Sequence, residues 1–181
     1  PAHDRAPRGG DSDVQALGAG QKITLIYKID IADNHGGTDT QEVRITINGT
    51  NDAPEITGGE TSGCVTEDAT PNIASGTLTK ADVDLNDTTS NDTWSVVVQN
   101  GQTAIPNDPT KVKGIYGTLS IDPSGTWTYT LDNSLPATQA LTGDDAPTET
   151  FVVKVTDSKG ASDTQTITVT VHGDDEAPSA V

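Results

Sequence analysis

Acidic residues are the part of this sequence with the clearest capacity for chemistry. Of the 181 residues, 27 are Asp or Glu and only 10 are Lys or Arg, so the formal net charge is −17. Carboxylate oxygens are the ligands that calcium prefers, roughly six to eight for each ion. The acidic surplus therefore favours a hard divalent cation as a partner. It disfavours nucleic acid and anionic membrane surfaces, because binding to either needs basic residues.

One acidic run has the spacing with which an EF-hand calcium loop begins, since residues 82–86 read Asp-Val-Asp-Leu-Asn. An EF-hand needs Gly at the sixth position of this loop and Glu at the twelfth. These positions hold Asp87 and Thr93, so the sequence excludes an EF-hand. Two interpretations stay open: a calcium site of another kind, and an acidic loop whose carboxylates are only hydrated.

Catalytic signatures are absent from the sequence. It contains no nucleophile elbow, no phosphate-binding loop and no His-Glu-x-x-His motif, so we do not expect an enzyme. The single cysteine, Cys64, has no catalytic context, and we expect it to pack as a small apolar residue at the start of a strand. No apolar run approaches the roughly 18 residues that insert into a membrane, so we expect no direct membrane insertion.

Alternating apolar and polar residues predict the elements that must position the acidic side chains. Residues 164–171 read Thr-Gln-Thr-Ile-Thr-Val-Thr-Val, and residues 125–131 read Gly-Thr-Trp-Thr-Tyr-Thr-Leu. A period of two is typical of a strand with one buried face. We therefore expect Trp127 and Tyr129 in a core and the threonines on the outside.

Turn residues separate the alternating runs. Residues 122–125 read Asp-Pro-Ser-Gly and residues 157–160 read Asp-Ser-Lys-Gly, and both sequences favour tight turns. Trp94, Val96 and Val98 form another short alternating run. No segment shows a helical period of useful length. The sequence thus predicts an all-β fold, an antiparallel immunoglobulin-like or cadherin-like sandwich.

An internal repeat organises the chain. Residues 15–54 align without a gap to residues 139–178, with 13 identities in 40 positions, and Asp33 aligns with Asp157. A repeat one domain length apart is typical of a tandem array. The predicted parts are a flexible segment at 1–16, the C-terminal hairpin of a preceding repeat at 17–50, a linker at 51–54, one complete module at 55–173, and a linker to the next repeat at 174–181.

The hairpin at 17–50 would carry an apolar face of its own. An isolated two-stranded hairpin is only marginally stable in water. Two accounts stay open: the hairpin docks on the complete module, or strands upstream of it complete its own sandwich. The apolar residues concerned are Ile23, Tyr27, Ile29, Ile31, Val43, Ile45 and Ile47.

Six motifs in a fixed order carry a resemblance to a known family. They are Gly-Thr-Asn-Asp-Ala-Pro at 49–54, Val-Thr-Glu-Asp at 65–68, Ser-Gly-Thr-Leu-Thr at 75–79, Asp-Val-Asp at 82–84, Tyr-Gly-Thr-Leu at 116–119 and Gly-Thr-Trp-Thr-Tyr at 125–129. Together they closely resemble the VCBS repeat of giant bacterial surface proteins, over all of 55–173. The resemblance implies an extender module of RTX-type adhesins, which are exported by type I secretion and act in cell adhesion and biofilm formation. It also implies an extracellular location at the bacterial cell surface, with neighbouring repeats as partners.

A more distant resemblance to cadherins implies a set of calcium ligands. Cadherin junctions hold calcium with an Asp-x-Asn-Asp-x-Ala-Pro linker, an Asp-x-Asp pair and an Asp before a Gly-containing turn. The residues at the matching positions are Asn51, Asp52, Asp82, Asp84 and Asp157. Gly49 replaces the first linker Asp, so one ligand of the cadherin pattern is missing.

The same resemblance implies a second junction downstream. Glu67 matches the Glu that reaches the opposite end of a cadherin module, where Asp174 and Asp175 form the next linker. Calcium at the junctions would convert a flexible polar linker into a fixed angle between modules. It would also stabilise the fold by mass action, in a chain whose single cysteine cannot form an intrachain disulfide.

Two functions follow from these observations. The first is a structural extender in an adhesin, stiffened by calcium, with any extracellular ligand bound by the whole adhesin. The alternative is an extracellular module that binds a glycan or a peptide through an exposed loop at residues 85–113, a long polar stretch interrupted by Pro106 and Pro109.

Overall fold

The chain divides into two compact units, and each has its own sheets. A computed structural model describes residues 12–85, 87 and 91–175. The first unit, here called the hairpin unit, contains Pro1–Asp52 and Val83–Thr88, and the second, here called the module, contains Ala53–Asp82 and Thr89–Val181. Apart from one helical turn, all regular elements of the described residues are strands. The predicted all-β architecture is confirmed.

The hairpin unit contains one long antiparallel pair. Strands β1 (Lys22–Ala32) and β2 (Thr38–Asn48) pair along their full length. Helix α1 (Ser12–Gln15) forms within the segment that was predicted to be flexible, and residues 1–11 of that segment lie outside the described part of the chain. At the tip of the hairpin, Asp33 Oδ1 accepts hydrogen bonds from the amides of His35 and Gly37. The two bonds, chiefly that from Gly37, hold the pKa of Asp33 below its usual value.

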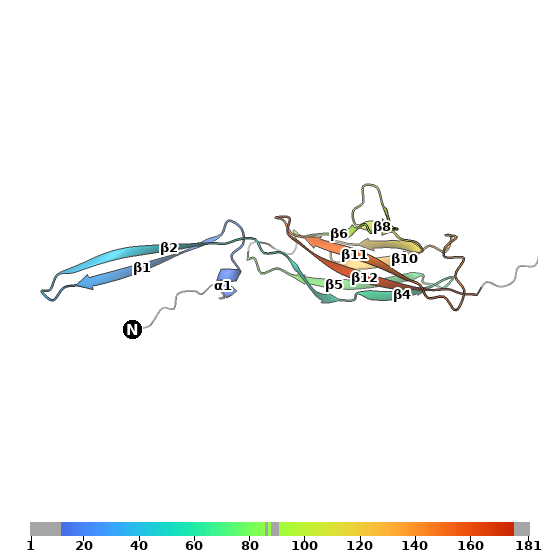
Figure 1. The fold of residues 1–181 in the computed structure, drawn as a ribbon, viewed down its shortest axis with the longest axis horizontal. Helices are drawn as coiled ribbons and strands as arrows, with labels where there is room; N and C mark the ends of the chain where they lie inside the picture. The colour runs from blue at the N-terminus through green and yellow to red at the C-terminus, as the bar shows by residue number, and fades with distance from the viewer. Residues whose placement is uncertain (1–11, 86, 88–90, 176–181) are drawn as a thin grey trace, which may run out of the picture. The chain divides into compact units, whose positions relative to one another are not determined.

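The module is a sandwich of two sheets (Figure 1). One sheet has six strands in the order β3-β5-β10-β9-β8-β7, and the other has four in the order β4-β12-β11-β6. The strands are β3 (Glu55–Gly59), β4 (Ser62–Thr66), β5 (Ile73–Ala81), β6 (Thr93–Val97), β7 (Thr103–Ala104), β8 (Lys111–Lys113), β9 (Gly117–Ile121), β10 (Thr126–Leu131), β11 (Thr148–Thr156) and β12 (Ser162–His172). All pairs are antiparallel except β4 and β12, which run parallel. The antiparallel sandwich is thus confirmed, with one parallel pair that the sequence did not predict.

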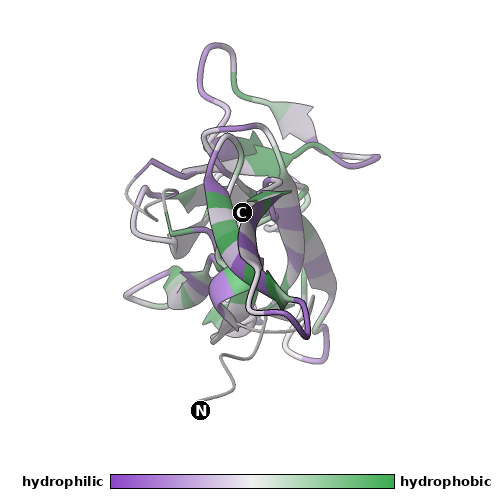
Figure 2. Cartoon of the chain, turned by 90° about the vertical axis from the view of Figure 1, so that its left-hand side faces the viewer, coloured by the Kyte–Doolittle hydropathy of each residue, from purple (hydrophilic) through white to green (hydrophobic). Residues whose placement is uncertain are grey.

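The core lies between the two sheets. Trp127 and Tyr129 of β10 are completely buried, as the alternation predicts. Figure 2 shows hydrophilic and hydrophobic bands that alternate along strands of the chain. The other buried apolar side chains of the core are Val65, Ala74, Leu78, Trp94, Val96, Val112, Leu119, Ile121, Leu131, Phe151, Val153, Val155, Ile167, Val169 and Val171.

Trp127 also fixes the place where the chain passes from one sheet to the other. Strands β3 and β4 are consecutive but belong to different sheets, and Glu60 lies between them. The indole Nε1 of Trp127 donates a hydrogen bond to the carbonyl oxygen of Glu60 at 2.7 Å. A Cβ atom on Gly76 would lie 2.9 Å from Trp127 Cε2, so the ring can sit against β5 only because this residue is glycine. The segment between β3 and β4 is therefore hydrogen-bonded directly to a side chain of the core.

Three details differ from the sequence predictions. Cys64 is exposed rather than packed, because the next residue, Val65, points into the core and neighbours on a strand face opposite sides. Val98 is exposed because β6 ends at Val97. The stretch 85–113, predicted as a long loop, contains β6, β7 and β8.

The repeated hairpin has two different environments in the two units. Ile45 of β2 aligns with Val169 of β12, at the offset of 124 residues. Ile45 is 46% exposed, whereas Val169 is completely buried. The same sequence pattern thus lies in the core in the module and in contact with solvent in the hairpin unit.

The two aligned positions give a matched test of this difference. We expect Val169→Thr to lower the free energy of unfolding by about 1–3 kcal/mol, because the new hydroxyl is buried in an apolar site. Ile45→Thr should change it by less than about 0.5 kcal/mol, as is usual for an exposed residue. Urea unfolding followed by far-UV circular dichroism measures both, since strands of the hairpin unit and of the module both contribute to the signal. A similar loss for the two variants would contradict the exposed position of Ile45.

Candidate metal centre

Two carboxylates from opposite sheets meet at one end of the module. Asp82 directly follows β5 of the six-stranded sheet, and Asp157 directly follows β11 of the four-stranded sheet. A carboxylate oxygen of one lies within 4.8 Å of a carboxylate oxygen of the other. Asp82 is half-buried and Asp157 is only 6% exposed. Two ionised groups repel each other at this distance, and a divalent cation between them would convert repulsion into attraction.

Asp157 is held in place by the turn that the sequence predicts at 157–160. Its Oδ1 atom accepts hydrogen bonds from the amides of Lys159 at 2.8 Å and Ala161 at 2.9 Å. Asp33 makes the equivalent pair of bonds in the hairpin unit, where it is exposed. The local sequence therefore determines the turn, whereas the burial of Asp157 and its closeness to Asp82 come from the sandwich.

A second part of the predicted ligand set comes together within the hairpin unit. The amide of Asp52 donates a hydrogen bond to Asp84 Oδ2 at 3.0 Å. The amide of Leu85 donates to the carbonyl oxygen of Ala16, also at 3.0 Å. Asp84 is buried, while Asn51 and Asp52 are half-buried. The linker and the segment around Asp84 are thus bonded to each other.

Asp87 is an acidic residue of this region that the sequence analysis did not identify as a candidate ligand. Asp87 was considered only as the residue that rules out an EF-hand, yet its side chain is buried. Its amide donates to the carbonyl oxygen of Asp84 at 3.2 Å, which forms a turn between the two residues. The signal in the sequence was the spacing of three aspartates, at 82, 84 and 87, within one short stretch.

The residues predicted for the downstream junction are arranged differently. Glu67 is 1% exposed, and its Oε1 atom accepts a hydrogen bond from Gln139 Nε2 at 3.0 Å. Asp174 and Asp175 are exposed, and Asp175 Oδ1 accepts from the amide of Gly143. Within the described part of the chain, these three carboxylates do not come close enough to share one ion. Their role at a junction stays a prediction.

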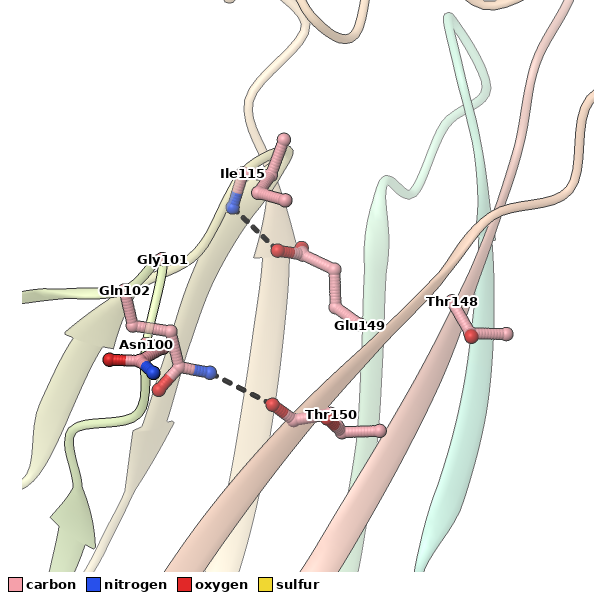
Figure 3. A pocket seen from close by; sticks show the side chains of 7 residues that line it. All are labelled: Asn100, Gly101, Gln102, Ile115, Thr148, Glu149 and Thr150. Carbon is pink, nitrogen blue, oxygen red and sulfur yellow. Dashed lines mark hydrogen bonds between the residues drawn. The ribbon is translucent and has the colours of Figure 1, made fainter.

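A cavity of about 160 Å³ lies beside the stretch from which the ligand-binding alternative was predicted (Figure 3). Its residues are Asn100, Gly101, Gln102, Ile115, Thr148, Glu149 and Thr150. Glu149 is its buried charged group. The amide of Ile115 donates to Glu149 Oε1, and both the hydroxyl of Tyr129 and the amide of Tyr116 donate to Oε2.

These bonds make Glu149 a structural residue. A Cβ atom on Gly114 would overlap the Glu149 carboxylate, so glycine is what permits the close approach. Burial raises the pKa of Tyr129, and the hydrogen bond to Glu149 raises it further. Tyr129 therefore stays a neutral donor over the whole physiological range. The carboxylate joins the 114–116 turn to β11 and to the core.

Comparison with known proteins gives one family and several structures. A family model described as the bacterial cadherin-like domain matches residues 51–173. No curated protein matches the sequence.

Among solved structures, the extracellular cadherin domains 1–5 of protocadherin gamma B2 are 15% identical over 86% of this chain and 27% of that chain, with a TM-score of 0.44. Domains EC1–3 of mouse clustered PcdhgC3 are 12% identical over 88% of this chain and 45% of that one, with a TM-score of 0.38. Domains EC3–6 of protocadherin gammaB7, in a cis-dimer structure, are 14% identical over 87% of this chain and 34% of that one, with a TM-score of 0.44. The chain thus spans less than half of each of these structures.

The bonds to Glu149 predict the effect of Tyr129→Phe. The variant leaves the shape of the core almost unchanged but removes one donor from a buried carboxylate, so we expect a loss of about 1–3 kcal/mol in the free energy of unfolding. Urea unfolding measures it, with Tyr116→Phe as the control, since Tyr116 bonds Glu149 through its backbone amide. Equal stability of Tyr129→Phe and the parent would show that the hydroxyl bond contributes nothing.

Proposed function

The family match covers more than half of the chain, so the chain belongs to the bacterial cadherin-like domain family, and we propose that it is part of an extracellular stalk whose neighbouring modules are held by calcium. The family supports a structural or adhesion-type module outside the cell. The observation that carries the calcium part is the approach of Asp82 and Asp157, within 4.8 Å, from two different sheets.

The chemistry of the donors favours calcium among common metal ions. The side chains around this end of the module and in the linker offer carboxylate and amide oxygens, which hard cations prefer to sulfur or imidazole ligands. The proposed ligands are Asn51, Asp52, Asp82, Asp84, Asp87 and Asp157. Calcium takes roughly six to eight oxygens in flexible geometry, so linker residues and module residues can share one ion. Bound there, the ion would restrict the angle between a module and the repeat before it.

The repeated hairpin supports the tandem arrangement. In the module, the apolar residues of β11 and β12 are buried against the opposite sheet, whereas the aligned residues of β1 and β2 include several exposed ones. An apolar face of this kind on β1 and β2 is typical of a strand pair that belongs to a sandwich. We propose that residues 17–50 are the C-terminal hairpin of a preceding repeat and that 55–173 is a complete one, with neighbouring repeats as the direct partners.

We propose the wider setting from the VCBS resemblance. The proposed parent protein is a large RTX-type adhesin at the bacterial cell surface, which leaves the cell by type I secretion and acts in adhesion and biofilm formation. No helix of the described residues is long and apolar enough to cross a membrane. The ligand-binding alternative has less support, because the buried carboxylate of the cavity in Figure 3 is already bonded to Tyr129 and two backbone amides.

Thermal unfolding with and without calcium tests the proposal. Relative to EDTA, about 5 mM calcium should raise Tm by about 10 °C if it exceeds Kd a hundredfold, since such binding contributes about 2.7 kcal/mol. Magnesium at the same concentration should raise Tm less, because it demands a smaller and more regular shell of ligands. An equal Tm in calcium and EDTA would rule out the calcium part of the proposal.

Substitution of ligands separates a specific site from a general effect of charge. Asp82→Ala combined with Asp84→Ala should abolish the rise in Tm with calcium. The control combines Glu42→Ala with Asp144→Ala, two exposed acidic residues whose loss changes the net charge equally and should preserve the rise. If the Asp82 and Asp84 variant responds to calcium like the parent, these residues are not the ligands.

A further inference from the structure

A buried ion pair joins the two sheets of the module near the candidate metal centre. Lys80 Nζ, on β5, lies 2.8 Å from Asp92 Oδ2, and Asp92 directly precedes β6. The two side chains are only 12% and 1% exposed. Lys80 Nζ also lies 5.8 Å from the ring centroid of Trp94, a core residue. The ammonium group is thus held between a carboxylate and an aromatic ring at the edge of the core.

Each member of this ion pair is close along the backbone to one of the two carboxylates. On the six-stranded sheet, Asp82 follows Lys80 by two residues. On the four-stranded sheet, Asp92 precedes Thr93, which lies opposite Thr156 in the β6–β11 ladder. Thr156 in turn directly precedes Asp157. The ion pair therefore connects the strand end that leads to Asp82 with the strand end that lies beside Asp157.

The charges of these four residues suggest what the connection between the strand ends does. Ionised Asp82 and Asp157 repel each other, and this force alone would separate the ends of the two sheets. The attraction between Lys80 and Asp92 acts at the same end in the opposite direction, and their burial protects it from screening by salt. A buried ion pair adds little to stability compared with apolar residues of the same size. A role in fixing positions is therefore the better explanation for its presence.

We infer that Lys80 and Asp92 form a positioning ion pair, which holds Asp82 and Asp157 at the separation that one divalent cation can bridge. The inference rests on the proposed calcium function and deepens it. It adds two residues that act through the placement of the ligands.

The first test replaces the ion pair without changing the net charge. In the parent chain, calcium binding is measured by titration calorimetry and compared with binding to the variant Lys80→Met with Asp92→Leu. One positive and one negative charge are lost together, so a change in Kd reports position rather than charge. We expect the Kd for calcium to rise by about 10- to 100-fold, the range typical of residues that orient metal ligands.

The matched control is a more exposed ion pair of the same module. Lys111 Nζ lies 3.0 Å from Asp108 Oδ2, with side chains 49% and 30% exposed. Lys111→Met with Asp108→Leu removes the same two charges and should leave the Kd for calcium unchanged. Circular dichroism checks that each variant is folded. If the Met and Leu variant does not fold, Lys80→Gln with Asp92→Asn replaces it.

The second test needs no calcium. In EDTA, Asp82→Asn should raise the Tm of the parent, because it removes the repulsion with Asp157. In the variant that lacks the ion pair, the two carboxylates can move apart, so Asp82→Asn should raise Tm much less. A merely structural ion pair would not alter the effect of Asp82→Asn.

The outcomes distinguish the inference from the proposed function. If the parent binds no calcium, the proposed function fails, and the effect of Asp82→Asn in the two backgrounds still decides the inference. If the parent binds calcium and the variant without the ion pair binds it equally well, the inference is wrong. An equal rise in Tm from Asp82→Asn in both backgrounds also overturns it.

Discussion

The packing of side chains between the two sheets is the interaction on which every other feature of the module depends. Leu, Ile, Val and Phe together supply only 35 of the 181 residues. They suffice because β10, β11 and β12 turn their apolar residues to the same interior, around Trp127 and Phe151. The acidic residues are then left to strand ends, turns and surfaces. Because opposed sheets lie about 10 Å apart, carboxylates that follow strands of different sheets can meet only at an end of the sandwich. Asp82 and Asp157 meet in this way.

The repeated hairpin shows which properties are local and which depend on the rest of the chain. Both copies form a long antiparallel pair, and both close it with an aspartate that accepts two backbone amides. The sequence of the repeat therefore determines the strand register and the turn geometry. It does not determine burial, since Val169 is buried and Ile45 is exposed to solvent. The acidic residue of the turn behaves likewise, because Asp157 is buried and Asp33 is exposed.

The sequence predicted those features that depend on neighbours along the chain. Alternation placed Trp127 and Tyr129 in the core, and the residues of the turn at 157–160 identified its geometry. It could not predict features that arise between distant segments. The parallel pairing of β4 with β12 is one such feature. Cys64 lies outside because its neighbour Val65 points into the core, and the bonds of Glu149 depend on a glycine 35 residues earlier. No sequence motif contains Lys80 and Asp92, and they form a pair only because their two sheets face each other.

For the candidate metal centre, the likeness to cadherins suggested Asp82 and Asp157 together. Asp87 went unrecognised because the cadherin pattern has no ligand at the matching position.

The parallel pairing of β4 and β12 has a consequence for force. Strand β4 is near the start of the module and β12 is its last strand, and they are paired over five residues from Ser62 opposite Thr168 to Thr66 opposite His172. Tension that pulls the two ends of the module apart slides parallel neighbours along each other. The hydrogen bonds between them are then strained together, whereas a hairpin pulled from its open end loses its bonds one after another. The direction of the β4–β12 pairing therefore favours resistance to tension applied along the module.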